Sequence, residues 1–295
     1  FLTKGYYTFE GDFWQKIKNY AAMAGASGNI GSTKLLPFFS LKHDFSDKLS
    51  FGVAFEKPFG AEVAYAPTSL AFAGTTANAD TSSITAILRY KFSDRFSVYG
   101  GPRWQTAEAD FSLTGAIYGP FSGYTATMAR DDSVGYVAGA AFEIPEYFIR
   151  AAITYSSAIE HTFTTTETSV FGVTTTPINV DTPQSVNFEF TAGVAPNTFI
   201  FGGARWVEWS ALKFAPPVLS GASPDPLVDF NDTITYSLGV GRRINENWTG
   251  IASVFYEPGT DPLTTPLAPI DGFYGGSIGA IYTKGNTQIH ANIMN

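Results

Sequence analysis

Residues 186–194 read Val186-Asn-Phe-Glu-Phe-Thr-Ala-Gly-Val194, with an apolar or small side chain at every second position and Asn, Glu, Thr and Gly between them. Successive side chains of a β-strand point to opposite faces of a sheet, so this alternation predicts a strand with one apolar and one polar face. The same period recurs in residues 134–142, 149–156, 274–282 and 288–295, although Val137 interrupts a face of small residues in the first of these. We therefore expect an all-β chain.

Six tight turns divide the chain. Each places turn-forming residues such as Ser, Asp, Asn, Pro or Gly between apolar segments, which is typical of a hairpin connection. The turns are residues 44–49, 91–96, 143–148, 194–199, 244–248 and 283–287. Their centres lie roughly 40 to 52 residues apart, the spacing of one hairpin plus one long loop. We expect long loops at residues 67–80, 162–183, 216–232 and 259–271, which are rich in Gly, Ser, Thr, Pro and Ala. Short turns at one end and long loops at the other predict an antiparallel up-and-down meander.

Composition excludes several classes of protein. Of the 295 residues, 15% are charged and 16% are aromatic, whereas an ordinary soluble domain carries roughly a quarter charged residues. So much apolar surface excludes disorder, and a net charge of −8 argues against binding nucleic acid. The absence of Cys excludes a disulfide scaffold and thiolate metal sites. No segment approaches the roughly 20 apolar residues of a membrane helix, so any membrane must be crossed by strands.

The expected strands suit a membrane barrel better than a soluble sandwich, which would also alternate. They repeatedly reach nine or more residues, about the length that a tilted strand needs to cross a bilayer. Aromatic side chains gather next to the turns, as in the girdles of membrane barrels. Examples are Phe92, Phe96, Tyr147, Phe148, Phe199 and Trp248. We therefore predict a transmembrane antiparallel up-and-down β-barrel.

The number of expected strands is odd. One strand at residues 5–9 and a pair around each turn make thirteen, whereas single-chain bacterial barrels have an even number. We therefore expect one domain over residues 1–295 that lacks a fourteenth strand. Residues 12–25 place Phe13, Ile17, Tyr20 and Ala21 at helical spacing, which predicts a short helix in the first long loop. This helix either caps the loop or touches lipid or ligand at the outer rim.

The chain resembles the FadL-type outer-membrane transporters of long-chain fatty acids and other hydrophobic compounds, related to the TodX type. The most specific segment runs from Asp181-Thr-Pro-Gln-Ser-Val-Asn-Phe-Glu-Phe to Ala204-Arg-Trp-Val-Glu-Trp-Ser210. Tyr155-Ser-Ser-Ala-Ile-Glu-His161 and Pro269-Ile-Asp-Gly-Phe273 are similar to other landmarks of that family. The resemblance covers nearly the whole chain and implies a 14-stranded barrel plugged by an N-terminal hatch. We expect the hatch to be missing from this chain.

The resemblance also implies a route in which extracellular loops capture the ligand and the ligand leaves sideways through a kink in the third strand. That strand contains Pro58, Phe59 and Gly60. Proline lacks the N–H that a ladder needs and glycine weakens pairing, so both interrupt a strand. An ordinary bulge at a strand end is the alternative interpretation.

Two sets of side chains are candidates for binding the ligand. Charged residues on the polar faces, which we expect to line the lumen, are Arg89, Arg103, Arg150, Glu189 and Arg205, with Arg243 and Glu257 assigned less clearly. Arginines there could hold a carboxylate, or they could pair with Glu to hold strands together. Apolar side chains in expected loops are Phe111, Leu113, Ile117, Tyr118, Phe121, Tyr124, Phe163, Val170 and Phe171. These could capture ligand or pack loop on loop.

An enzyme is not expected. His43, His161 and His290 have no metal-ligand spacing, and Ser156, Ser157 and His161 lack an orienting group or a G-x-S-x-G motif. We predict no cofactor and no metal site. The acidic loop residues suit Ca²⁺ or lipopolysaccharide-bridging cations no better than solvation. They are Asp110, Asp131, Asp132, Glu167, Asp225, Asp229 and Asp232.

The sequence therefore favours a monomeric, multi-pass protein of the bacterial outer membrane that passively transports long-chain fatty acids or similar hydrophobic compounds. Its expected partners are these small molecules, membrane lipid and lipopolysaccharide. The alternative is a general diffusion porin for small polar solutes, or a structural barrel.

Overall fold

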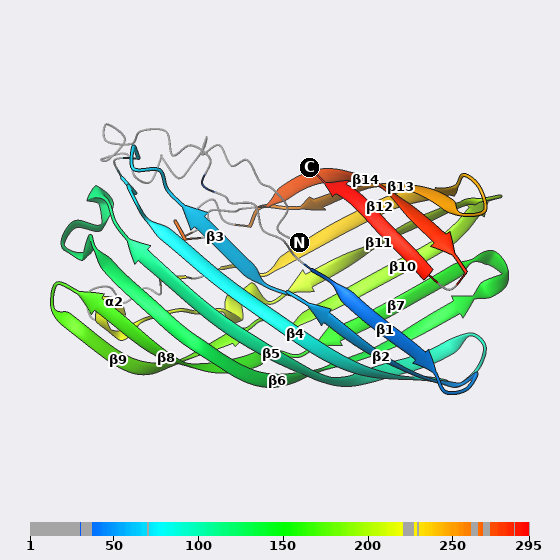
Figure 1. Ribbon diagram of the computed structural model, residues 1–295, viewed down its shortest axis with the longest axis horizontal. Coiled ribbons are helices and arrows are strands. Elements are labelled where there is room, and N and C mark those ends of the chain that lie inside the picture. Colours follow the sequence, from blue (N-terminus) through cyan, green and yellow to red (C-terminus); the bar gives the residue numbers. More distant parts are fainter. Residues whose placement is uncertain are drawn as a thin grey trace.

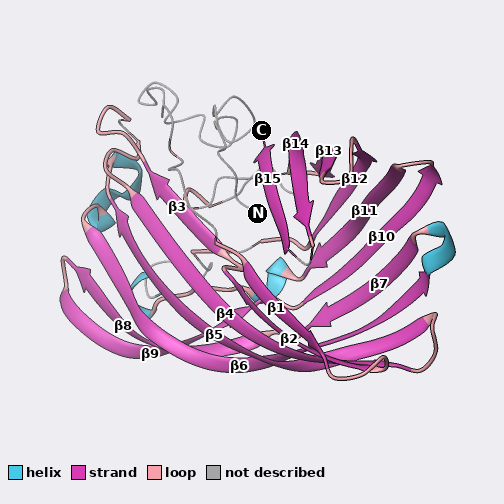
Figure 2. Cartoon of the chain, turned by 45° about the vertical axis from the view of Figure 1, so that its right-hand side comes forward, coloured by secondary structure: helices cyan, strands magenta, loops and turns pink. Residues whose placement is uncertain are grey.

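A computed structural model of the 295-residue chain describes residues 30, 37–69, 71–220, 227–228, 230–260, 265–267, 272–285 and 287–294. The strand expected at residues 5–9 and the helix expected at 12–25 lie outside the described residues. No described helix has the length and apolar character that crossing a membrane requires. The structure is a single antiparallel sheet that curls into an open barrel, with β1 and β15 as its edges (Figures 1 and 2).

The sheet contains all fifteen described strands. They are β1 (Phe39–Asp44), β2 (Leu49–Glu56), β3 (Gly60–Ala64), β4 (Thr76–Lys91), β5 (Phe96–Leu113), β6 (Tyr124–Ile144), β7 (Ile149–Ser156), β8 (Ile159–Ser169), β9 (Gly172–Thr182), β10 (Ser185–Ala195), β11 (Thr198–Val207), β12 (Thr233–Arg243), β13 (Trp248–Glu257), β14 (Phe273–Lys284) and β15 (Thr287–Met294). Short helices stand between some of them: η2 (Ala116–Phe121), η3 (Pro145–Tyr147), η4 (Trp209–Ala211) and α2 (Pro217–Ser220).

The strand order confirms the predicted meander. It runs β1-β2-β4-β5-β6-β7-β10-β11-β12-β13-β14-β15, and every pairing in it is antiparallel. The remaining strands continue a neighbour beyond a short break: β3 follows β2, β8 follows β7, and β9 precedes β10. All six predicted turns connect consecutive strands of this path, which gives twelve of the expected passes in the described residues.

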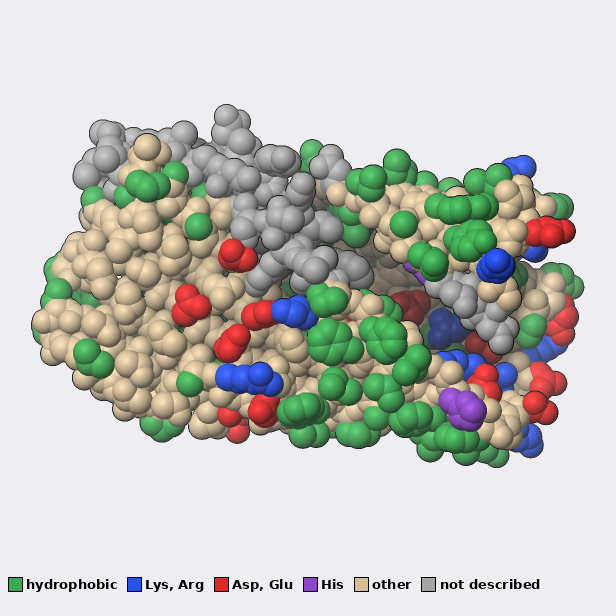
Figure 3. Space-filling model, viewed as in Figure 1, with side chains coloured by type: hydrophobic (Ala, Val, Ile, Leu, Met, Phe, Trp, Pro, Cys, Tyr) green, Lys and Arg blue, Asp and Glu red, His purple; other side chains and the backbone are tan. Residues whose placement is uncertain are grey.

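Exposed apolar side chains form a belt on the half of the barrel nearest the tight turns, and Figure 3 shows one face of it. It consists of exposed side chains at alternate positions of neighbouring strands, whereas Ser83 and Thr85 between them are buried. The belt includes Ile84 and Leu88, Val98 and Trp104, Val134 and Tyr136, Ile153, Phe188, Leu238, Val254 and Ile278. Apolar side chains facing outward are what a strand presents to lipid.

The central strands are longer than the belt is tall. β5 has 18 residues and β6 has 21, whereas crossing a bilayer takes about 9–11 tilted residues. The sheet therefore continues well beyond the belt, on the side away from the tight turns (Figure 1).

This extension corrects the loop prediction for residues 162–183. They form most of the hairpin β8–β9, which pairs from Ile159↔Thr182 to Ser169↔Gly172. Phe111, Leu113, Tyr124 and Phe163 likewise lie in strands and not in loops. The physical reason is that threonine is β-branched and favours strands, so the Thr-rich stretch is strand-forming rather than loop-forming.

Candidate functional site

The third pass of the expected barrel is interrupted at residues 57–59. β2 ends at Glu56, which pairs with Ser83, and β3 begins at Gly60, which pairs with Asp80. Three residues thus face two on β4, which is the residue count of a β-bulge. The β1–β2 ladder reaches only to Phe39↔Phe55, so β1 does not extend alongside β3. Among the described strands, β3 therefore pairs with β4 alone. We call residues 57–59 the wall break.

Side chains replace the backbone ladder inside the wall break. The N–H of Phe59 donates to Oγ1 of Thr81 at 2.9 Å, and the same hydroxyl donates to the carbonyl oxygen of Phe59 at 2.6 Å. Nζ of Lys57 pairs with Oδ2 of Asp80 at 2.6 Å. Proline at position 58 has no N–H to contribute. Among the described residues, the backbone of Phe59 is therefore hydrogen-bonded to one hydroxyl group and not to a strand.

The wall break stands at the edge of the apolar belt. Ile84, Trp104 and Val134 form one row across β4, β5 and β6, and all three are exposed. Beyond this row the outward positions turn polar, with Glu108 on β5 and Asp132 on β6. An opening here would lead to the boundary between the hydrocarbon and the polar surface of a membrane.

Three of the predicted lumen residues are held in ion pairs. Glu143 forms ion pairs with two arginines: its Oε2 lies 2.8 Å from Nη2 of Arg89, and its Oε1 lies 3.4 Å from Nε of Arg150. Nη2 of Arg103 pairs at 2.6 Å with Oε1 of Glu56, the residue next to the wall break. These contacts cross from strand to strand, as the alternative interpretation of the lumen charges expected.

The other lumen candidates differ from these three. Arg205 lies within electrostatic range of Glu56, Glu257 and Arg103, and its buried Nε has no acceptor among the described residues. Glu189 makes no ion pair in the described part of the chain. Arg243 donates to the carbonyl oxygens of Asn245 and Glu246 in its own turn, so it is not a lumen-binding residue. Figure 3 shows charged side chains deep in the hollow at the open side of the barrel.

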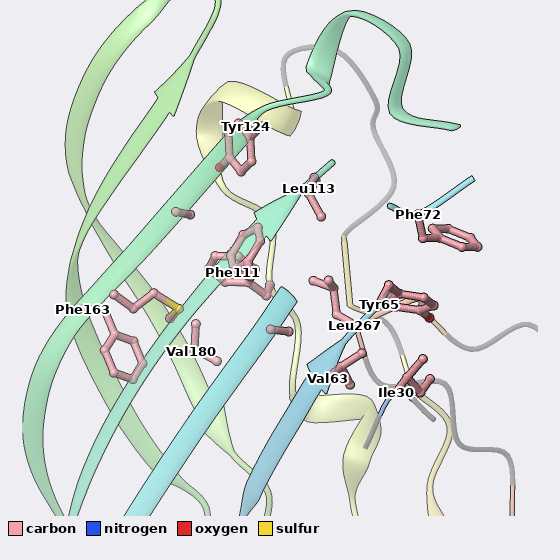
Figure 4. Packing of buried hydrophobic residues seen from close by; sticks show 14 of the residues in the cluster. Ile30, Val63, Tyr65, Phe72, Phe111, Leu113, Tyr124, Phe163, Val180 and Leu267 are labelled. Carbon is pink, nitrogen blue, oxygen red and sulfur yellow. The ribbon is translucent and has the colours of Figure 1, made fainter. Parts of the chain in front are cut away.

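The predicted apolar candidates separate into two groups. Phe111, Leu113, Tyr124 and Phe163 are at most 6% exposed and belong to one core cluster beyond the belt (Figure 4). Ile117, Tyr118 and Phe121 pack against it. Val170 and Phe171, at the tip of the β8–β9 hairpin, are 67% and 79% exposed. The ring centroids of Phe171 and Phe121 lie 6.3 Å apart, so the exposed tip borders the cluster.

Several members of this cluster were missed by the sequence reasoning. Val63, Tyr65 and Phe72 come from β3 and the segment after it, and Leu267 comes from a later loop (Figure 4). Phe214, from the loop after β11, belongs to the same cluster. The hydroxyl of Tyr65 donates to the carbonyl oxygen of Pro266 at 2.9 Å. Phe72 and Leu267 lie in segments expected to be loops, where an apolar side chain was the available signal, whereas no local pattern marked Val63, Tyr65 or Phe214. The cluster therefore joins β3, directly beyond the wall break, to the hairpin tip.

One acidic side chain is buried beside the cluster. Glu167 is fully buried, and its Oε1 accepts hydrogen bonds from the Tyr124 hydroxyl at 2.6 Å and from the N–H of Val218 at 3.1 Å. The second contact ties α2 to β8. Among the other acidic candidates, Asp110 accepts from Asn78 and Asp232 accepts from the N–H of Ser210. Asp225 and Asp229 lie outside the described residues.

His161 has partners that the sequence did not predict. Its Nδ1 lies 2.9 Å from Oδ2 of Asp131, and its Nε2 lies 3.1 Å from Oε1 of Gln105. Asp131 is thus an orienting group, but Nε2 faces an amide where a hydrolase needs its serine. Oγ of Ser157 instead accepts the N–H of Tyr136. This arrangement bridges β5, β6 and β8 and does not form a catalytic triad.

Comparison with known proteins identifies the family. The family model described as "Outer membrane protein transport protein (OMPP1/FadL/TodX)" matches residues 6–290. No curated protein sequence matches the chain. The crystal structure of a Pseudomonas aeruginosa FadL homologue is similar with a TM-score of 0.73 and 19% identity, over 91% of this chain and 71% of that one. The Pseudomonas putida toluene transporter TodX has a TM-score of 0.62 and 11% identity over 90% and 78%. The Ralstonia pickettii toluene transporter TbuX has a TM-score of 0.60 and 13% identity over 91% and 82%.

Proposed function

Because the chain belongs to the OMPP1/FadL/TodX family of outer membrane transport proteins, we propose that it carries hydrophobic compounds from outside the cell into the outer leaflet of the bacterial outer membrane. The compound leaves the barrel sideways through the wall break. The observation that carries this proposal is the position of the break, directly beyond the last apolar row of the belt. A ligand that leaves there passes from the interior to lipid without entering bulk water.

Capture of the ligand begins at the exposed hairpin tip. Val170 and Phe171 present apolar surface to solvent, and such surface binds apolar ligands. The buried members of the cluster hold the strands and loops around that surface in place. We assign capture to the tip and packing to Phe111, Leu113, Tyr124 and Phe163.

Long-chain fatty acids are the ligand class that we propose first. A carboxylate accepts charge-assisted hydrogen bonds from arginine, and Nε of Arg205 is a buried donor without an acceptor in the described residues. Monoaromatic hydrocarbons are the second class, since toluene transporters share the fold and Glu56 and Glu257 offset the two nearby arginines. The protein acts as a monomer in this account, with its belt in lipid and its polar rim against lipopolysaccharide.

The test compares fluxes through the full-length protein in proteoliposomes. We expect transfer of labelled oleate or toluene without swelling in a small sugar. Arg205→Met should slow the transfer of oleate and leave that of toluene unchanged, whereas Arg243→Met, at the end of β12 beside a tight turn, should change neither. Swelling in sugar without selective transfer of hydrophobic ligand would mean an open porin and would refute the proposal.

A further inference from the structure

Phe59 in the wall break touches a side chain from a distant part of the sheet. Its ring lies 5.5 Å from the ring of Trp209, centroid to centroid, in an edge-to-face arrangement at 73°. Trp209 begins η4, directly after β11, and β5, β6, β7 and β10 stand between β4 and β11 in the strand order. The two rings therefore meet across the interior and not along the wall.

Hydrogen bonds on both sides of Trp209 and an aromatic contact fix its position. The N–H of Glu208 donates to the carbonyl oxygen of Gln184 at 3.1 Å, and Nε2 of Gln184 donates to the Glu208 carboxylate at 2.7 Å. On the other side, the N–H of Ser210 donates to Asp232 at 3.1 Å. The ring itself packs edge-to-face on Phe230, with centroids 6.0 Å apart. Both residues that flank Trp209 in the chain are thus tied to other segments.

Phe59 is held much less firmly. Its backbone has the Thr81 hydroxyl as partner in place of a strand, and it follows a proline that cannot donate. Edge-to-face aromatic pairs contribute as much stabilisation as a typical hydrogen bond in water. In the described part of the chain, the contact with Trp209 therefore stands beside the two hydrogen bonds to Thr81 as a comparable interaction that keeps Phe59 in the break.

We propose that Trp209 is a gating residue: a fixed ring against which Phe59 closes the wall break. The inference rests on the proposed sideways exit and adds the residue that sets how readily the exit opens. An apolar ligand, whether an alkyl chain or an aromatic ring, can replace Phe59 as the packing partner of Trp209, so its arrival favours opening.

The loop that carries Trp209 also reaches the cluster. Phe214 packs edge-to-face on Phe111 at 5.4 Å, and the N–H of Val218 binds the buried Glu167. Residues 208–220 thus contact the wall break at one end and the buried cluster beneath the hairpin tip at the other. A ligand that rearranges the cluster acts on the segment that positions the gating ring.

The test uses Trp209→Ala in the full-length protein, with Trp209→Phe retaining a ring. Trp104→Ala is the matched control, because Trp104 pairs with Ile84 in the row next to the wall break but is exposed on the outer face. We expect hydrogen exchange at the Phe59 amide to rise roughly fivefold in Trp209→Ala, the effect of losing one aromatic pair. Exchange should stay near the wild-type rate in the other two variants.

Unchanged exchange at Phe59 in Trp209→Ala would overturn the inference. If that variant fails to assemble, Trp209→Leu carries the same test, because it keeps apolar volume and loses the aromatic contact. Faster exchange with faster transfer of hydrophobic ligand supports both proposals. Faster exchange without any change in transfer supports the gating contact and refutes the sideways exit, so the two failures are distinguishable.

Discussion

Replacing Phe111 by Ala tests whether the buried aromatics of the cluster hold together the strands beyond the apolar belt. Phe111 is 6% exposed, and its ring contacts those of Tyr124 at 5.8 Å and Phe214 at 5.4 Å. Truncation of a buried Phe to Ala costs about 3–5 kcal/mol. Because Phe111 joins β5 to the β11–β12 loop, we expect this loss to appear as local opening beyond the belt.

The matched control is Phe171→Ser at the exposed hairpin tip. With 79% of its surface in solvent, Phe171 contributes little packing, so stability should change by less than about 0.5 kcal/mol. Limited proteolysis of the full-length protein measures local opening, and titration with oleate measures capture. Phe111→Ala should raise the cleavage rate strongly, whereas Phe171→Ser should leave cleavage unchanged and weaken ligand binding. Equal effects of both variants on cleavage would refute the division between packing and capture.

Three further variants probe the break, the lumen and the cluster. Thr81→Val removes both hydrogen bonds to Phe59, at about 1 kcal/mol each; exchange at the Phe59 amide should rise at least tenfold, and an unchanged rate would contradict this. Arg103→Met removes the ion-pair partner of the Glu56 carboxylate and should lower the free energy of unfolding by about 1–3 kcal/mol. Denaturation in detergent should show that the double variant Arg103→Met with Glu56→Gln recovers part of this loss. Burial raises the pKa of Tyr118 to about 12, above the unfolded value of about 10. The share of stability that depends on neutral Tyr118 should be complete below about pH 10 and lost towards pH 12. Because burial also raises the pKa of Tyr65 and of Tyr124, alkaline melting of Tyr118→Phe should show a smaller loss than the wild type, and an equal loss would contradict the assignment.

Local patterns predicted much of the fold. The period-2 alternation and the turn residues were sufficient to predict the six hairpin turns and the strands that flank them, because both signals depend on neighbours in the chain. Pro58 and Gly60 marked the position where β2 gives way to β3. The β8–β9 hairpin was missed, because its Thr-rich residues were interpreted as a loop from their composition and not as strands from their β-propensity.

The site depended on contacts that no local pattern contains. The partners of Arg103 and His161 come from other strands, and the register that brings them together follows from the folded sheet. Trp209 was noticed only as part of a family landmark, since nothing near it in sequence points to Phe59. The division of the apolar candidates into buried and exposed groups also required the folded chain.

A reversible cross-link across the wall break tests the sideways exit most directly. The chain has no cysteine, so Phe59→Cys with Thr81→Cys would create a single pair at positions already in contact. Val53→Cys with Ala86→Cys, which pair in the intact β2–β4 ladder, is the matched control. Transfer of hydrophobic ligand by the full-length protein should stop when the first pair is oxidised and return on reduction, while the control stays active in both states. Equal transfer with the break cross-linked or free would contradict the account.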